Sequence, residues 1–97
     1  DPWEKRKEEA LAHLAKADVR EQMLVLADKL ANMRAIARDY AKYGEDLWRR
    51  FKRGKNIQSW YYHAAVQAMS DFEFDAEAAH FYKEFEDKVN QVFGDKG

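Results

Sequence analysis

An all-α fold, a compact bundle of about four helices, is predicted by three observations. Residues of high helix propensity dominate the sequence, threonine is absent, and the only proline is Pro2, in the first turn of an expected helix. Apolar residues recur every three to four positions, and no segment alternates with the period of a strand. Ninety-seven residues are enough for one domain, so residues 1–97 are expected to form a single helical domain.

The first two helices are predicted from their start and stop signals. The chain begins with a capping Asp, a Pro and, three positions after the Asp, a Glu, which predicts a helix up to about residue 17. Asp18 and Glu21 repeat this pattern and predict a second, longer helix up to about residue 43. Gly44 is expected to end it, because glycine adopts the conformation that terminates helices.

Two more helices are predicted in the second half of the chain. A short helical turn is expected at 45–51, after which Asn56 and Asp75 are placed to cap a third and a fourth helix. Gly94 is expected to close the fourth. The expected core stripes are Ile57, Trp60, Tyr61, Ala64 and Ala68 on the third helix, and Ala78, Phe81, Tyr82, Phe85, Val89 and Val92 on the fourth.

The second helix is apolar on two opposite faces. One face holds Met23, Leu26, Leu30, Met33 and Ala37, and the other holds Leu24, Val25, Asp28, Ala31, Asn32 and Ala35. Such a helix is expected to be covered on both sides, so that Asp28 and Asn32 would face packed protein. A buried carboxylate needs a compensating partner. The residues leave two candidates open, a metal ion and a salt bridge to a Lys or Arg of another helix.

Composition excludes several kinds of chemistry. The chain has no cysteine, which rules out disulfides, thiol catalysis and cysteine-based zinc sites, and no apolar run is long enough to span a bilayer. The three histidines lie on three different predicted helices, outside any known ligand motif, and neither Ser59 nor Ser70 lies in a nucleophile elbow. We therefore expect no catalytic residue in this chain, no membrane partner and a cytoplasmic location.

A basic segment stands out near the middle of the chain. The sequence RRFKRGK at 49–55 has five basic residues in seven and is followed by WYY at 60–62. Basic side chains beside aromatic ones can bind nucleic acid or phosphate, but they also occur in solvated loops whose aliphatic stems cover apolar surface. Because the net charge of the whole chain is −1, no nucleic-acid partner is expected.

The segment LADKLANMR, which contains Asp28 and Asn32, resembles the last conserved block of HD-domain metal-dependent phosphohydrolases. Within that family it most resembles the branch of Rel/SpoT-type hydrolases of the alarmone guanosine tetraphosphate. PWEKRK at 2–7, YGEDLWRRF at 43–51 and WYY at 60–62 are also similar to small stand-alone members of that branch. The resemblance covers roughly residues 2–69.

The resemblance implies a divalent metal, usually manganese, that activates water for attack on a phosphoester or pyrophosphate of a nucleotide substrate. Asp28 would be one metal ligand. Asn32 would orient the nucleotide or the metal's surroundings, and Lys29 and Arg34 are further candidates for contact with substrate phosphates.

The chain also departs from the family pattern. No His is followed by Asp, and the upstream His ligand and the acidic catalytic residues have no counterpart, so one of four expected ligands is present. We therefore expect the C-terminal part of a larger HD domain, binding no metal tightly by itself and either self-associating or pairing with the missing N-terminal half. The alternatives are a helical interaction module that meets an acidic partner through RRFKRGK, and a degenerate HD relative without activity.

Overall fold

The computed structural model describes residues 2–94 and confirms the all-α prediction. Four α-helices and two 3-10 segments follow one another without a strand in the described part of the chain. Their bounds are α1 Pro2–Lys16, α2 Val19–Tyr43, η1 Gly44–Arg50, α3 Lys55–Ala68, η2 Ser70–Phe74 and α4 Ala79–Phe93. The capping role expected for Asp1 lies outside the described residues.

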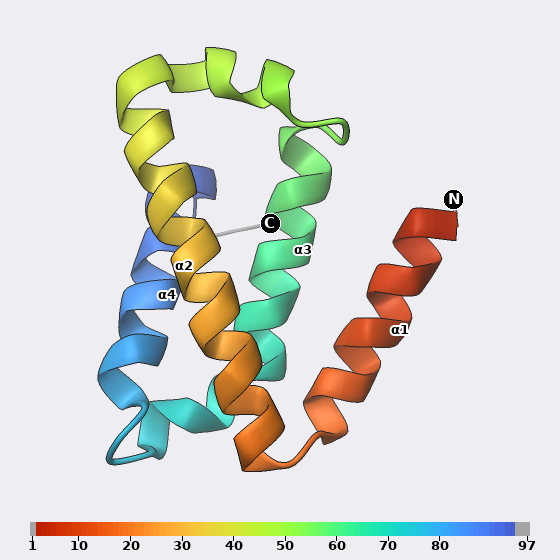
Figure 1. Ribbon diagram of the computed structural model, residues 1–97, viewed down its shortest axis with the longest axis vertical. Helices are drawn as coiled ribbons and strands as arrows, with labels where there is room; N and C mark the ends of the chain where they lie inside the picture. Colours follow the sequence, from red (N-terminus) through yellow and green to blue (C-terminus); the bar gives the residue numbers. More distant parts are fainter. Residues whose placement is uncertain (1, 95–97) are drawn as a thin grey trace.

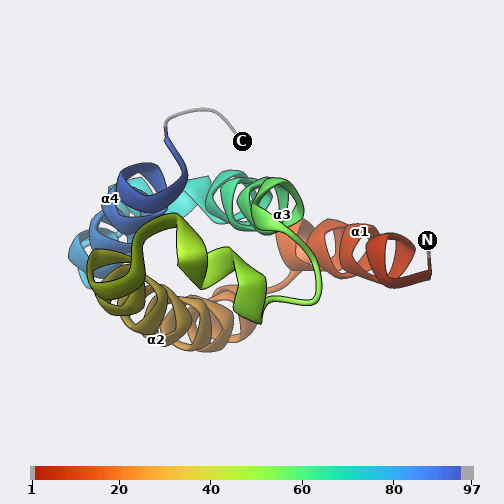
Figure 2. The same ribbon diagram turned by 90° about the horizontal axis from the view of Figure 1, so that it is seen from above.

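Helices α2, α3 and α4 form the body of the molecule, and α1 lies outside it (Figure 1). Helix α4 packs against both α2 and α3, while η1 crosses one end of the bundle and contacts α2. Helix α1 packs mainly against α3, and in the view from above it extends away from the other three helices (Figure 2). This arrangement leaves a space between α1 and α2 that no further helix of the described chain fills.

Local hydrogen bonds explain most of the helix boundaries. The Asp18 carboxylate accepts a hydrogen bond from the backbone N–H of Glu21 at 2.8 Å, as expected of an N-cap. Gly44 has a φ of 60°, and its N–H donates to the carbonyl of Tyr40, which ends α2. Asp75 accepts hydrogen bonds from the N–H groups of Glu77 and Ala78 in the turn before α4, but the N-cap of α4 is Ala78, so the cap predicted at Asp75 lies three residues too early.

The core is centred on α4. Tyr82, Phe85, Val89 and Val92 are buried as predicted, whereas Phe81 of the same predicted stripe is exposed. The hydroxyl of Tyr82 donates to the carbonyl of Val66 on α3, and burial raises the pKa of Tyr82 to about 12.

The predicted register of α3 is wrong by about one position. The helix starts at Lys55, so Asn56 lies inside it and not at its cap. The buried residues of this segment are Ser59, Tyr62, Ala65, Val66 and Met69, whereas the predicted stripe is only partly buried. The reason is that α3 carries apolar residues on several faces, so the spacing of these residues does not show which face is buried. Tyr61, expected in the core, instead lies beside α1 and α2.

The expectation that α2 is covered on both faces is also wrong. Leu26, Leu30, Met33 and Ile36 are buried, but the face that contains Asp28 and Asn32 is largely open. Leu24 on that face is 69% exposed. Asp28 therefore does not face packed protein, and in this chain its charge is solvated.

None of the helices within residues 2–94 has the length and apolarity that a bilayer crossing requires.

Candidate functional site

A groove of about 430 Å³ lies between α1 and α2, and Asp28 is on its wall. Its lining is mostly apolar, with four polar side chains among the ten residues. The lining residues are Ala10, Leu11, His13 and Leu14 of α1, Glu21, Leu24, Val25, Asp28 and Lys29 of α2, and Tyr61 of α3. A mostly apolar concave surface with a few polar groups is typical of a binding site.

Asp28 is 68% exposed, and its Oδ2 lies 3.5 Å from Nζ of the neighbouring Lys29. A contact of this length between adjacent residues at the surface stabilises a protein little. It is also not the interhelical salt bridge that the sequence left open as the alternative to a metal. The Asp28 carboxylate is therefore accessible to an additional cation.

Lys29 is held more firmly than its acidic neighbour. Its side chain is only 19% exposed, and its Nζ lies 5.3 Å from the centre of the Tyr61 ring. Burial by itself lowers the pKa of Lys29, but a hydrogen bond to Tyr61 and nearby negative groups outweigh it, so the pKa is raised. Lys29 thus places a fixed positive charge beside Asp28.

The same tyrosine connects this cation to α1. Nζ of Lys7 lies 5.0 Å from the centre of the Tyr61 ring and 5.7 Å from that of Trp3. Each distance is within the range of cation–π attraction. The fold therefore places Lys7 and Lys29 against one aromatic ring.

Asn32 lies one turn after Asp28 on the open face of α2. It forms a hydrogen bond with Tyr62 that lowers the pKa of that tyrosine, but burial has the larger effect and the pKa of Tyr62 is raised. Asn32 is therefore oriented by a buried residue of α3 while itself remaining exposed.

Arg34 is not brought to this site. Its guanidinium binds Glu84 of α4 through two hydrogen bonds, Nε to Oε2 at 2.6 Å and Nη2 to Oε1 at 2.7 Å. The guanidinium lowers the pKa of Glu84 to about 2. Of the residues singled out from the sequence, Asp28, Lys29 and Asn32 lie together, and Arg34 joins α2 to α4.

Sequence reasoning missed Lys7 and Tyr61. They come from α1 and α3, and their contact with each other depends on how the helices pack. The i, i+4 spacing of Trp3 and Lys7 was a usable signal, because it places an aromatic ring and a cation on one face of α1.

The histidines do not assemble a metal centre in the described chain. Nε2 of His13 lies 2.7 Å from the carboxylate of Glu21 at the edge of the groove. His80 packs against Phe81, and Nε2 of His63 is buried without a hydrogen-bond partner among the described residues. Within residues 2–94, no three His, Cys, Asp or Glu side chains are grouped so that they could hold a metal ion.

Comparisons of this chain with protein-family models, with curated proteins and with solved structures gave no match.

Proposed function

We propose that this chain is the C-terminal part of an HD-type metal-dependent phosphohydrolase acting on guanosine tetraphosphate-like nucleotides or related phosphoesters. Asp28 supplies one ligand of a divalent metal, with manganese the expected ion. The remaining ligands come from residues outside this chain, which pair with the open face of α2.

The environment of Asp28 is the main support for this proposal. Its carboxylate is 68% exposed on the wall of a groove, beside a Leu24 side chain that is 69% exposed. An exposed apolar surface around an accessible carboxylate is typical of a face that another protein segment covers. Once covered, that carboxylate would need a cation, which a metal ion supplies.

The other groups of the groove suit a phosphorylated substrate. Lys29 and Lys7 are held against the ring of Tyr61, and Lys29 lies beside Asp28, so these cations are placed to attract substrate phosphates. Asn32, oriented through Tyr62, offers an amide that can contact a nucleotide. The metal, when bound, supplies Lewis acidity and activates water.

The test compares Asp28→Asn with Asp87→Asn in the longer protein that this proposal requires. Asn keeps the size of Asp but removes its charge, and Asp87 is a matched acid that is 62% exposed on α4. We expect Asp28→Asn to lose manganese affinity, measured by calorimetry, and at least about a hundredfold in hydrolysis of guanosine tetraphosphate, because losing a ligand should cost no less than the roughly 10–100-fold caused by losing a group that only supports one. Asp87→Asn should retain both properties.

Unchanged manganese binding in Asp28→Asn would contradict the ligand assignment. The isolated 97-residue chain provides a second check. The proposal gives this chain one metal ligand, whereas sites for such metals use three or more, so the chain alone should not bind manganese tightly. Micromolar manganese affinity of the chain alone would show that the site is built differently.

A further inference from the structure

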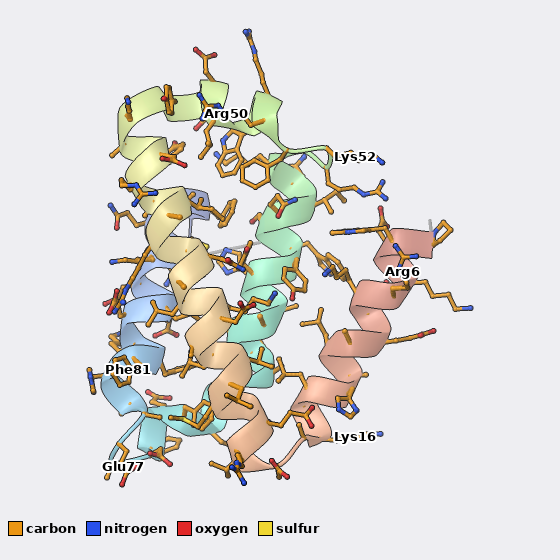
Figure 3. The ribbon with its side chains drawn as sticks, viewed as in Figure 1. Arg6, Lys16, Arg50, Lys52, Glu77 and Phe81 are labelled. Atoms are coloured by element: carbon orange, nitrogen blue, oxygen red, sulfur yellow. The ribbon has the colours of Figure 1, made fainter. Side chains whose placement is uncertain are left out.

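The end of the molecule formed by η1, the loop after it and the start of α1 carries most of the positive charge. Residues 2–7 and 42–55 hold nine Lys and Arg side chains and three Asp and Glu side chains, a net charge of +6, although the whole chain has a net charge of −1. Figure 3 shows Arg50 and Lys52 at this end, with Arg6 on the nearby part of α1. We call this surface the basic end.

Aromatic rings connect the two segments and fix the cations in place. The guanidinium of Arg53 lies 5.0 Å from the centre of the Trp3 ring, which joins the loop to α1. The guanidinium of Arg50 lies 4.1 Å from the centre of the Tyr43 ring. Cation–π contacts of this kind hold charged groups in position without neutralising them.

The carboxylates of η1 are already engaged. Asp46 lies 3.9 Å from Nε of Arg49, while Glu45 accepts a hydrogen bond from Tyr40 and lies 3.3 Å from Nζ of Lys55. The hydrogen bond from Tyr40 is the main reason that the pKa of Glu45 is lowered. Residues 42–55 hold six basic and two acidic side chains, so this end keeps a net positive charge that can attract an anionic partner.

The chemistry of this surface favours phosphates over a membrane and over stacked bases. Of the large hydrophobic side chains that are exposed, Val19, Leu24, Phe74 and Phe81 lie on other elements, and Tyr43 at this end lies under the guanidinium of Arg50. Proteins that bind single strands stack bases on open aromatic faces. Here Arg50 lies over Tyr43, and Lys7 and Arg53 lie over Trp3, so cations cover these rings.

We propose that the basic end binds the phosphate backbone of double-stranded nucleic acid without reading its sequence. Fixed guanidinium groups suit phosphate oxygens, because they donate paired hydrogen bonds as well as charge. This inference concerns a surface separate from Asp28 and does not rest on the proposed hydrolase function.

The experiment measures binding of the 97-residue chain to short labelled duplex DNA, duplex RNA and single-stranded RNA by fluorescence anisotropy, and to anionic vesicles by co-sedimentation. For four phosphate contacts we expect duplex affinity to fall roughly 100-fold between about 50 mM and 200 mM salt. Replacing Arg49, Arg50 and Lys52 together by Gln should weaken duplex binding at low salt at least about tenfold and lower the salt slope by about 2 to 3. A second variant, Lys5→Gln with Arg6→Gln, tests whether α1 contributes.

A matched control replaces Lys16, Arg20 and Arg38 by Gln, which removes the same charge from exposed positions elsewhere. We expect this control and Asp28→Asn to bind duplex like the unmodified chain. No duplex binding at low salt, equal weakening by the control, or tighter binding to single strands or anionic vesicles than to duplex would overturn the proposal. Duplex DNA and duplex RNA present the same phosphate chemistry, so the duplex that binds with higher affinity is identified as the preferred partner.

Discussion

At the scale of single residues, the exposure of Asp28 decides whether this acid among apolar residues needs a compensating partner. If Asp28 were buried, it would require a partner whose removal leaves an unpaired charge. In the structure it is 68% exposed, and its only close cation in the described chain is the adjacent Lys29. The carboxylate therefore contributes little to the fold and is available for binding.

This exposure predicts how the isolated chain responds to Asp28→Asn. We expect the free energy of unfolding, measured by urea denaturation, to change by less than about 0.5 kcal/mol, because the substitution removes a solvated surface charge. A loss of about 3–5 kcal/mol, the size expected for breaking a buried ion pair, would instead show that Asp28 supports the fold.

The proposal that Asp28 is a metal ligand rests on the family resemblance, and the surroundings of Asp28 could be predicted from the sequence only in part. Asn32 and Lys29 follow from the helical period, because they lie next to Asp28 on the same helix. Tyr61 does not, because it lies on α3 and reaches the groove only through tertiary packing, and the contact of Lys7 with its ring depends on the packing of α1.

At the scale of elements, the contact between α2 and α4 combines a buried apolar face with a surface ion pair. Leu26, Leu30 and Met33 are buried on α2, and Arg34 extends from the same helix to Glu84. Glu84 also lies 3.4 Å from Nζ of Lys88, so two cations stabilise its charged form.

This pair predicts part of the acid sensitivity of the protein. The pKa of Glu84 is lowered from 4.5 to about 2, so its contribution to stability is complete above pH 4.5 and is lost as the pH falls toward 2. We expect Glu84→Gln to reduce the loss of stability between those two pH values, measured by urea denaturation at a series of pH values. Asp87→Asn, a control on the same helix, should lose more stability than Glu84→Gln over that pH range. If the free energy of unfolding falls with pH equally in both variants, the Arg34–Glu84 pair does not have this role.

Helix boundaries were more predictable than helix faces. A capping residue such as Asp18 acts through a hydrogen bond to a backbone N–H three positions away, so the sequence contains the necessary information. The face of α2 that is buried depends on which helices pack against it. Because α2 has two apolar faces, its sequence does not show which of them will be buried. In α3 the run of apolar residues around Tyr62 obscured the register in the same way.

At the scale of the whole molecule, one three-helix core supports both surfaces. The groove depends on α2, α3 and the attached α1, and the basic end depends on η1 crossing the bundle. The all-α class could be predicted because helix propensity and periodicity agree along the whole chain. The basic segment at 49–55 is also visible in the sequence, but its joining with the cations of α1 into one basic end could not be predicted, because it requires α1 and the loop at 51–54 to meet in space.

The final prediction compares two phenylalanines that lie in opposite environments. Phe85 on α4 is 0% exposed, and its ring packs edge-on against that of Tyr62 on α3 at 6.4 Å, whereas Phe74 is 85% exposed. Phe85→Ala should cost about 3–5 kcal/mol of unfolding free energy, because the cavity removes packing from the centre of the bundle. A domain of this size has only about 5–15 kcal/mol in total, so circular dichroism should show it unfolding at much lower urea. Phe74→Ala should change stability by less than about 0.5 kcal/mol. Similar costs for both variants would mean that α4 is not the centre of the core.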